Sequence, residues 1–458
     1  MTRMKKVLIL VFLGFQSVFA QYTKLLDFEN FNDGAQPLGS LTSDGNVLYG
    51  LAGQGGTHHV GIIFSIHKDG SGYKKLYDFD ITNGAVPKGS LILSGNVLYG
   101  MADGGTSSKG VIFSIHTDGS AFKKLLDFNG QNGADPRATL VLSENTLLGM
   151  TTSGGVNNKG AIFSINTDGT GYKKLYDFDG INGAYPLGSL TLSGTILYGM
   201  TSNGGTYDIG NIFSIHTDGT EYKKLLDFSG GDGRSPRGAL TLSGNTLYGM
   251  THTGGGSDST GCIFSILTDG TNYKKLLNFN KINGAYPSGS LTLSGNSLFG
   301  MTNEGGKDSV GCVFSILTDG TGYQKLYEFN NINGANPYGD LTLSGNTLYG
   351  MTHFGGVGLA GVIFSLKPNV SEVSNVQRCN LKVSPNPTTG KFAIYFESGV
   401  SMENLIITDI QGRKSYASVN AITFPYILNL EGKPKGIYLL NVITKRGDIF
   451  TAKVSLVY

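Results

Sequence analysis

The chain of 458 residues contains no tryptophan and only three cysteines, and charged residues make up 15% of it. Its formal net charge is +2 at pH 7, so it lacks the clustered basic excess with which proteins bind nucleic acids. Beyond the first twenty residues, no segment is long and apolar enough to span a bilayer as a helix. These absences argue against a nucleic-acid partner and against a transmembrane segment in the mature chain.

Motifs for common catalytic chemistry are also missing. The sequence has no GxSxG nucleophile elbow, no HExxH zinc motif, no phosphate-binding loop and no cysteine pairs at zinc-binding spacing. The seven histidines are scattered, and convergent partner ligands do not accompany them. We therefore expect a protein that is not an enzyme and that uses no resident metal.

The N-terminus has the pattern of a secretory signal peptide. A basic start, MTRMKK, precedes the apolar run VLILVFLGF, and a small-residue exit ends at Ala20. An uncleaved anchor is the less favoured alternative, because the apolar run is short for a membrane span. We expect residues 1–20 to be removed as a signal peptide and the chain to be exported.

Seven copies of one unit follow, with a period of about 50 residues. Each copy reads as four strands of the forms YKKLYDF, GSLTLSG, TLYGMT and GxIFSIxTDG, bounded by Gly, Asn and Asp. This is the pattern of a β-propeller blade, and the nearly continuous apolar runs ILYGM and NIFSI indicate sheets covered on both faces. A linear β-solenoid is the alternative, although solenoids usually have shorter periods and capping units.

Loop lengths indicate where each blade begins. TDG and SGN are tight hairpin signals within a blade, whereas the longer connection DFDGINGAYP at 177–186 is expected to cross between blades. The last copy lacks its fourth strand, and residues 22–28 form an orphan one. We predict that residues 22–28 pair with residues 361–366 and close a seven-bladed propeller, which spans residues 21–367.

Two of the cysteines, Cys262 and Cys312, occupy the same position in neighbouring copies. Other copies have Ile, Val, Ala or Asn there, which indicates a small, mostly apolar packing position. Equivalent points on adjacent blades are too far apart for the Cα spacing of a disulfide. We therefore expect free, buried thiols.

The repeat unit YKKLYDFDGxNGAxPxGSLTLSGNTLYGMTxxGG, over residues 22–366, resembles the GloVer tandem repeats of secreted and surface bacterial proteins. GGxxxxGxIF followed by a strand that begins with Tyr is also similar, more distantly, to the kelch blade, with Tyr in place of its usual tryptophan. The resemblance implies a propeller on an exported protein and implies little about a ligand.

A different pattern begins after the last repeat. Residues 368–380 form a polar linker, and residues 381–458 read as the strands of a small immunoglobulin-like β-sandwich. This module closely resembles the type A sorting domain of the type IX secretion system. The residues that carry the resemblance are Pro385, Asn386, Pro387, Gly390, Asp409, Gly412, Gly436, Tyr438 and Lys453.

The sorting-domain resemblance has consequences for partners and location. It implies that the secretion machinery binds residues 381–458 and that the protein is secreted or held at the outer-membrane surface of a Gram-negative bacterium. An ordinary immunoglobulin-like accessory domain is the alternative.

Differences between the copies concentrate in the loop after LYGMT and around the loop proline. In a propeller both loops emerge on the same side of the disc, so one face is uniform and the other is varied, as on a binding scaffold. Neutral drift in exposed loops is the alternative. The candidate ligand site on the varied face comprises Arg137, Tyr185, Arg237, Tyr286 and Tyr338 near the axis, with His252, His353 and Phe354 at its rim.

Tyrosine rings and guanidinium groups suit stacking on sugars and bonding to hydroxyls or carboxylates. The sequence therefore predicts a monomeric, non-enzymatic surface propeller that binds an extracellular glycan or another surface protein. A polysaccharide lyase or hydrolase, and a purely structural or adhesive protein, are the alternatives. No cofactor is expected. Calcium at Asp177, Asp179 and Asn182 is less favoured than turn capping by these side chains, because the EF-hand spacing is missing.

Overall fold

The computed structural model describes residues 20–29, 31–368, 382–395, 402–409, 414–419, 426–444 and 449–457. The chain divides into two compact units, Met1–Asn369 and Val370–Tyr458. Several expectations fall outside the described residues: the predicted signal peptide up to residue 19, the predicted linker from residue 369 onward, Cys379 and Gly412.

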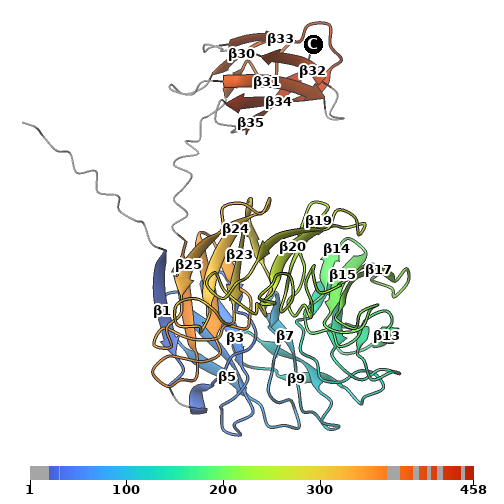
Figure 1. Ribbon diagram of the computed structural model, residues 1–458, viewed down its shortest axis with the longest axis vertical. Helices are drawn as coiled ribbons and strands as arrows, with labels where there is room; N and C mark the ends of the chain where they lie inside the picture. The colour runs from blue at the N-terminus through green and yellow to red at the C-terminus, as the bar shows by residue number, and fades with distance from the viewer. Residues whose placement is uncertain are drawn as a thin grey trace, which may run out of the picture. The chain divides into compact units, whose positions relative to one another are not determined.

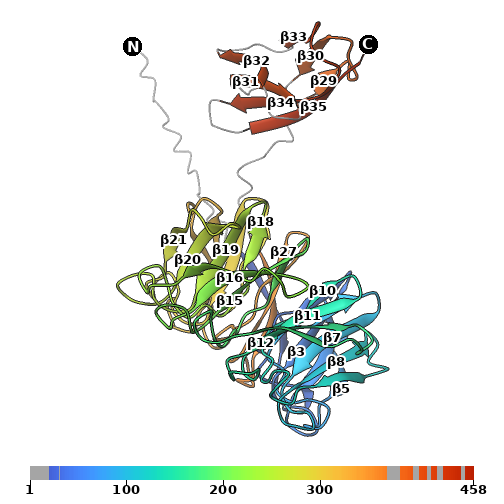
Figure 2. The same cartoon turned by 90° about the vertical axis from the view of Figure 1, so that its right-hand side faces the viewer.

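Seven antiparallel sheets of four strands build the first unit, and Figures 1 and 2 show them following one another in chain order. Blade 1 contains β2(Thr42–Asp44), β3(Val47–Ala52), β4(Ile62–His67) and β5(Lys74–Asp78). Blade 2 contains β6(Ile92–Ser94), β7(Val97–Ala102), β8(Val111–His116) and β9(Lys123–Asp127). Blade 3 contains β10(Val141–Ser143), β11(Thr146–Thr151), β12(Ala161–Asn166) and β13(Lys173–Asp177). Blade 4 contains β14(Thr191–Ser193), β15(Ile196–Thr201), β16(Asn211–His216) and β17(Lys223–Asp227). Blade 5 contains β18(Thr241–Ser243), β19(Thr246–Thr251), β20(Cys262–Leu267) and β21(Lys274–Asn278). Blade 6 contains β22(Thr292–Ser294), β23(Ser297–Thr302), β24(Cys312–Leu317) and β25(Gln324–Glu328). Blade 7 contains β26(Thr342–Ser344), β27(Thr347–Thr352), β28(Val362–Lys367) and β1(Gln21–Asp27), and the short 3₁₀ helix η1(Phe31–Asp33) follows β1.

The N-terminal strand completes the last blade, as predicted. β1 pairs antiparallel with β28 in a register that sets Tyr22 opposite Leu366 and Asp27 opposite Val362. The first and last blades also meet at the axis, where the backbone N–H of Asp340 donates to the Ser40 Oγ at 2.6 Å. The propeller is therefore a closed ring, and the solenoid alternative is wrong.

The hydrophobic core lies between blades. One buried cluster joins Leu148, Met150 and Ile162 of blade 3 to Leu197 and Phe213 of blade 4, and equivalent clusters recur around the ring. Because the middle strands of each sheet pack against a neighbouring blade on both faces, their sequences are apolar without strict alternation. This packing explains why runs such as ILYGM read as buried strands.

The inner strands are linked around the axis by repeated polar contacts. The backbone N–H of Ser40 donates to the Ser90 Oγ at 2.7 Å, and that of Ser90 donates to the Thr139 Oγ1 at 3.0 Å. Between blades 4 and 5 this hydrogen bond cannot form, because Ala239 of blade 5 has no hydroxyl to accept it. These contacts satisfy backbone groups near the axis, where the inner ends of neighbouring blades approach one another.

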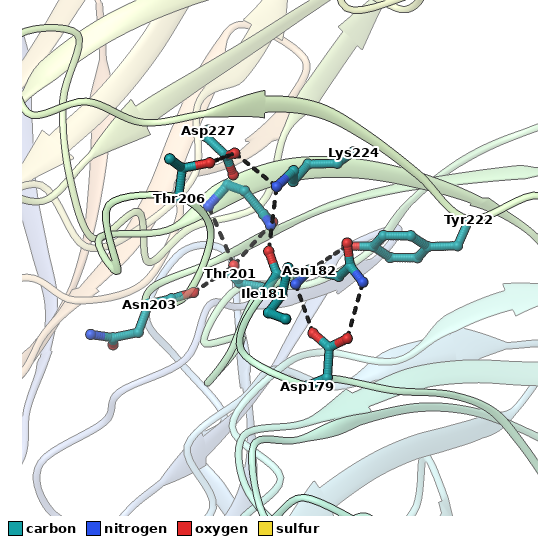
Figure 3. Close-up of polar contacts among 10 residues, drawn as sticks. Asp179, Ile181, Asn182, Thr201, Asn203, Thr206, Tyr222, Lys224 and Asp227 are labelled. Carbon is teal, nitrogen blue, oxygen red and sulfur yellow. Dashed lines mark hydrogen bonds and ion pairs between the residues drawn. The ribbon is translucent and has the colours of Figure 1, made fainter.

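The interblade turn is held by its own acidic and amide side chains, as Figure 3 shows for blade 4. Asp179 accepts hydrogen bonds from the backbone N–H and the Nδ2 of Asn182, at 2.7 and 3.0 Å. The Tyr222 hydroxyl donates to the Asn182 carbonyl at 2.5 Å. Hydrogen bonding within the turn thus explains why Asp179 and Asn182 occur at these positions. Among the described residues, no group of three or more His, Cys, Asp or Glu side chains is arranged to hold a metal ion.

Both described cysteines, Cys262 and Cys312, are buried and free, as predicted. Burial raises the pKa of Cys312 to about 11 and also raises that of Cys262. The thiols are therefore protonated and unreactive at neutral pH.

Blade 4 carries Asn211 at this same packing position. Asn211 is fully buried, and its Oδ1 accepts a hydrogen bond from the Thr201 Oγ1 at 3.0 Å. Its Nδ2 finds no hydrogen-bond partner in the described part of the chain. A buried donor that is left unpaired costs about 1–3 kcal/mol.

Replacement of Asn211 by Val is expected to stabilise the protein by about 1–3 kcal/mol, because the unpaired amide is removed. Valine fits, since Val111 and Val362 are fully buried at the equivalent positions of other blades. Without the amide, the Thr201 hydroxyl donates its one proton to the Asn203 carbonyl, 2.9 Å from its Oγ1. Thermal unfolding measures the change, and Val362→Asn is the reverse control, expected to destabilise. A lower melting temperature for Asn211→Val would contradict this account.

The second unit contains two small sheets. One has the strand order β29(Lys382–Ser384), β30(Lys391–Tyr395), β33(Tyr426–Asn429), and the other β32(Lys414–Val419), β31(Met402–Asp409), β34(Gly436–Thr444), β35(Ile449–Leu456). Phe392 and Leu428 of the first sheet share one buried cluster with Leu405, Leu440 and Val454 of the second. The two sheets therefore pack face to face as a sandwich, as predicted.

Candidate functional site

A cavity of ≈ 250 Å³ lies at the axis of the first unit. It is lined by the residue that follows the loop proline in each blade, namely Leu38, Lys88, Arg137, Leu187, Arg237, Ser288 and Tyr338. The seven positions are equivalent in the fold but carry five different residue types. The cavity is therefore chemically asymmetric although the scaffold around it is nearly symmetric.

The residue before each loop proline has a left-handed backbone. Tyr185 and Tyr286 have φ values of 53° and 54°, and the same conformation occurs at this position in every blade. The backbone N–H of Tyr286 donates to the Thr260 carbonyl at 2.9 Å, and Tyr185 makes the equivalent bond to Lys159. Strain of this kind can mark a functional site, but its recurrence in all seven blades makes it a property of the fold.

His252 joins blades 5 and 6 beside the cavity. Its Nδ1 lies 3.2 Å from the Pro287 carbonyl, and its ring centroid lies 5.4 Å from that of Tyr286. In the preceding blade, the Ser202 Oγ donates the equivalent hydrogen bond to the Pro236 carbonyl. Side chains at this position therefore link neighbouring blades. Burial and the charge of Arg237 lower the pKa of His252 to about 4, so the imidazole is neutral at pH 7.

A row of aromatic rings leads away from the cavity in blade 7. The ring of Tyr338 lies 5.1 Å from that of His353, which lies 4.2 Å from that of Phe354. The His353 Nδ1 is 3.4 Å from the Pro37 carbonyl, and burial lowers the pKa of this histidine. Phe354 is 39% exposed. The row thus presents neutral rings to solvent at pH 7.

Two of the three cations that line the cavity are paired with carboxylates. The Lys88 Nζ lies 2.5 Å from the Asp103 Oδ2 and 2.9 Å from the Asp135 Oδ1, and the Arg137 Nε lies 3.0 Å from the Asp135 Oδ2. Burial raises the pKa of Asp103 to about 6. Burial opposes ionisation of Asp135 as well, but the hydrogen bonds and charges of Lys88 and Arg137 together outweigh burial and lower the pKa of Asp135. This side of the cavity is close to electrically neutral.

The third cation, Arg237, is half-buried and has no ion-pair or hydrogen-bond partner among the described residues. Burial and repulsion from Arg137 lower its pKa, whereas the nearby Tyr338 opposes that change. A guanidinium stays charged at pH 7 under such a shift. Arg237 is thus the one uncompensated charge among the seven residues that line the cavity.

Comparison with known proteins identifies the repeat. The model of the Gloeobacter/Verrucomicrobia repeat matches residues 101–260 and 243–393, more than half of the chain. The chain belongs to this repeat family. The resemblance found in the repeat unit is therefore confirmed.

The second unit of this Gloeobacter/Verrucomicrobia repeat protein matches the secretion system C-terminal sorting domain over residues 382–455. The protein is therefore handled by a type IX secretion system and is secreted or displayed at the cell surface. None of the described residues builds a helix with the length and hydropathy of a membrane span.

The predicted sorting residues lie on connected elements of the second unit. Asn386 donates from its Nδ2 to the Lys453 carbonyl at 2.7 Å and accepts from the Ser455 N–H at 2.9 Å. Asp409, at the end of β31, stands opposite Tyr438 of β34 in the sheet. Pro385, Pro387 and Gly390 flank the short strand and turn around Asn386, and Gly436 begins β34. The proline motif thus lies against the strand that carries Lys453.

Solved structures share the fold of the repeat protein at low identity. The extracellular domain of a hybrid two-component system from B. thetaiotaomicron is 12% identical, with a TM-score of 0.51, and the alignment covers 96% of this chain and 59% of that one. A puromycin-hydrolysing peptidase from Mycobacterium tuberculosis is 11% identical, with a TM-score of 0.50, over 82% of this chain and 61% of that one. An oligogalacturonate lyase in complex with manganese is 12% identical, with a TM-score of 0.49, over 77% and 94%.

The comparisons leave the activity of the repeat protein open. A search of curated proteins finds no match. The chain spans less than two thirds of the two-component and peptidase structures, and at these identities the likeness is one of fold alone. Function must therefore be argued from the cavity itself.

The structure gathers most of the predicted ligand residues but divides them into groups. Arg137, Arg237 and Tyr338 line the cavity, His252 and Tyr286 contact each other beside it, and His353 and Phe354 continue from Tyr338. Tyr185 is 40% exposed in blade 4, and none of the ring contacts between described residues involves it. These placements leave the roles of the eight residues as predictions.

Sequence reasoning missed several neighbours of the site, namely Leu38, Lys88, Leu187 and Ser288 on the cavity wall and Asp103 and Asp135 behind it. A signal for the first four was present. Each follows a loop proline, in the same register as the two arginines and Tyr338, so comparison of that one register across all seven copies would have found the whole ring. The pairing of Asp103 with Lys88 has no such signal.

Proposed function

We propose that this secreted or cell-surface propeller binds an extracellular glycan at its axial cavity, without an enzymatic step. The observation that supports the proposal is the group of neutral aromatic rings beside the cavity. Tyr286 and His252 form one part of it where blades 5 and 6 meet, and Tyr338, His353 and Phe354 form the other part in blade 7. Rings with an apolar face and a polar edge suit sugars, whose faces are apolar and whose rims carry hydroxyls.

Binding is favoured over cleavage by the state of the nearby carboxylates. Glycoside hydrolysis generally uses two carboxyl groups that flank the bond, one to protonate and one to attack or activate water. The seven residues that line the cavity include no carboxylate. Asp340 lies in the adjoining layer of residues around the axis, where burial raises its pKa and its Oδ1 accepts a hydrogen bond from the backbone N–H of Ser290. Asp103 and Asp135, which lie behind the cavity, are both engaged by Lys88.

Glycan-array binding with parent and variant proteins tests the proposal. Tyr286→Ala and Tyr338→Ala are each expected to weaken binding roughly tenfold, as for loss of about 1.4 kcal/mol of contact. Tyr207→Ala is the control, because Tyr207 is 60% exposed in blade 4, does not line the cavity and is not one of the predicted ligand residues. The control is expected to bind as the parent does.

Two results would overturn the proposal. The first is a parent protein that retains no glycan on the array. The second is retention by Tyr286→Ala and Tyr338→Ala as strong as that of Tyr207→Ala, with all three variants shown to be folded by their melting temperatures.

A further inference from the structure

Resting on the proposed function, we infer that the glycan is acidic and that Arg237 binds a carboxylate of one of its sugar residues. The chemical class is a uronic-acid-containing polysaccharide. The inference goes beyond glycan binding because it assigns one residue the choice between charged and neutral sugars.

The first step of the inference is the difference between Arg237 and the other two cations of the cavity. Lys88 and Arg137 are matched by Asp103 and Asp135 at 2.5–3.0 Å. Arg237 is half-buried without any such partner among the described residues. Removing a charge from water without a counter-ion is unfavourable, and an anionic ligand would relieve that cost.

The second step is the geometry of the group that Arg237 would bind. A guanidinium presents a planar fork of N–H donors that matches a carboxylate in a bidentate pair. In a uronic acid the carboxylate is attached to the same six-membered ring that stacks on an aromatic side chain. A single sugar residue can therefore contact Arg237 and a tyrosine of the cavity at once, and Tyr338 lines the same cavity as Arg237.

The third step concerns the surroundings of the site. The paired charges of Lys88, Asp103, Asp135 and Arg137 nearly cancel on their side of the cavity. His252 has a pKa of about 4, and burial also lowers the pKa of His353, so both add no charge at pH 7. The ligand would therefore meet one positive centre at Arg237, flanked by neutral rings.

The test uses the full chain and matched pairs of polymers. Alginate, polygalacturonate and hyaluronan are each compared with their own carboxyl-reduced form, which keeps the sugar chain but loses the charge. The parent is expected to bind at least one uronate polymer roughly tenfold or more tightly than its reduced form. Arg237→Gln is expected to abolish that preference, so that the acidic polymer and its reduced form bind with equal affinity.

Two further variants sharpen the result. Arg237→Lys keeps the charge but loses the planar fork, so it is expected to bind the acidic polymer with intermediate affinity. Arg234→Gln is the control, because Arg234 lies in the same loop, is exposed and does not line the cavity. It is expected to behave as the parent does.

The outcomes separate this inference from the proposed function. Equal binding of acidic and reduced polymers that still depends on Tyr338 would overturn the role of Arg237 and keep glycan binding. Preference for a sulfated glycan over every uronate polymer would overturn carboxylate recognition. Loss of all glycan binding, or binding that ignores both Tyr286 and Tyr338, would overturn the proposed function itself.

Discussion

A chain that begins at residue 30 is expected to unfold roughly 10 °C below one that begins at residue 21, because blade 7 loses its outer strand. β1 pairs with β28 over residues 21–27, so its removal leaves an unpaired edge strand in the ring. The same deletion removes Tyr22 and Phe28, whose burial links three blades. A loss of more than about 5 kcal/mol is expected, since truncating one buried Phe alone costs about 3–5 kcal/mol.

The contacts of β1 explain why its effect extends beyond one sheet. The ring of Tyr22 stacks on that of Tyr327 in blade 6, with centroids 4.0 Å apart and planes at 7°. Phe28 is 1% exposed and packs in one cluster with Leu48 and Phe64 of blade 1. β1 therefore ties blade 7 to both of its neighbours.

Calorimetry of the two chains measures the effect. The double variant Tyr22→Ala/Phe28→Ala is expected to reproduce most of the loss, and Thr23→Ala, on the same strand, very little. A synthetic peptide of residues 21–29 added to the shortened chain is expected to raise its melting temperature again. An unchanged melting curve after the deletion would show that the ring does not depend on β1.

Gly199→Ala is expected to destabilise blade 4 by about 3 kcal/mol, because no room exists for one methyl group. A Cβ at this glycine of β15 would lie 2.4 Å from the Cζ of Phe213 on the adjacent strand β16. Phe213 is fully buried, and its ring packs edge-on against Phe178 at 5.5 Å, so it cannot withdraw without disturbing its neighbours. Gly199 is therefore required because a residue with a Cβ does not fit beside the Phe213 ring.

Two further variants check the cause of this effect. Phe213→Leu shortens the opposing side chain, so the double variant Gly199→Ala/Phe213→Leu is expected to lose less stability than the sum of the two single changes. Gly231→Ala is the control, since a Cβ there would meet no atom within 4 Å. Additive losses in the double variant, or an equal loss in Gly231→Ala, would contradict the steric explanation.

The number of blades, their strand order and the closure by residues 22–28 could all be predicted from the sequence. The signals are local and repeated: hairpin turns such as TDG mark which strands are neighbours, and a missing fourth strand at one end matches an extra strand at the other. The sorting module was equally accessible, because its motifs around Asn386 and Tyr438 are contiguous in the chain. Free thiols at Cys262 and Cys312 followed from comparing the copies.

The composition of the candidate site depended on the fold in three dimensions. Lys88 meets Asp103 of its own blade and Asp135 of the turn that leads into the next blade, and these two pairs leave Arg237 as the uncompensated cation. Tyr185 and Tyr286 are indistinguishable in register, yet only Tyr286 contacts a histidine, since Ser202 stands in blade 4 where His252 stands in blade 5. The sequence of one repeat predicts the structure of its own blade well, because the residues that contact each other within a blade are close in sequence. Several contacts near the axis, such as Lys88 with Asp135 and His252 with Tyr286, join residues of neighbouring blades, and only the packing of one blade on the next brings them together.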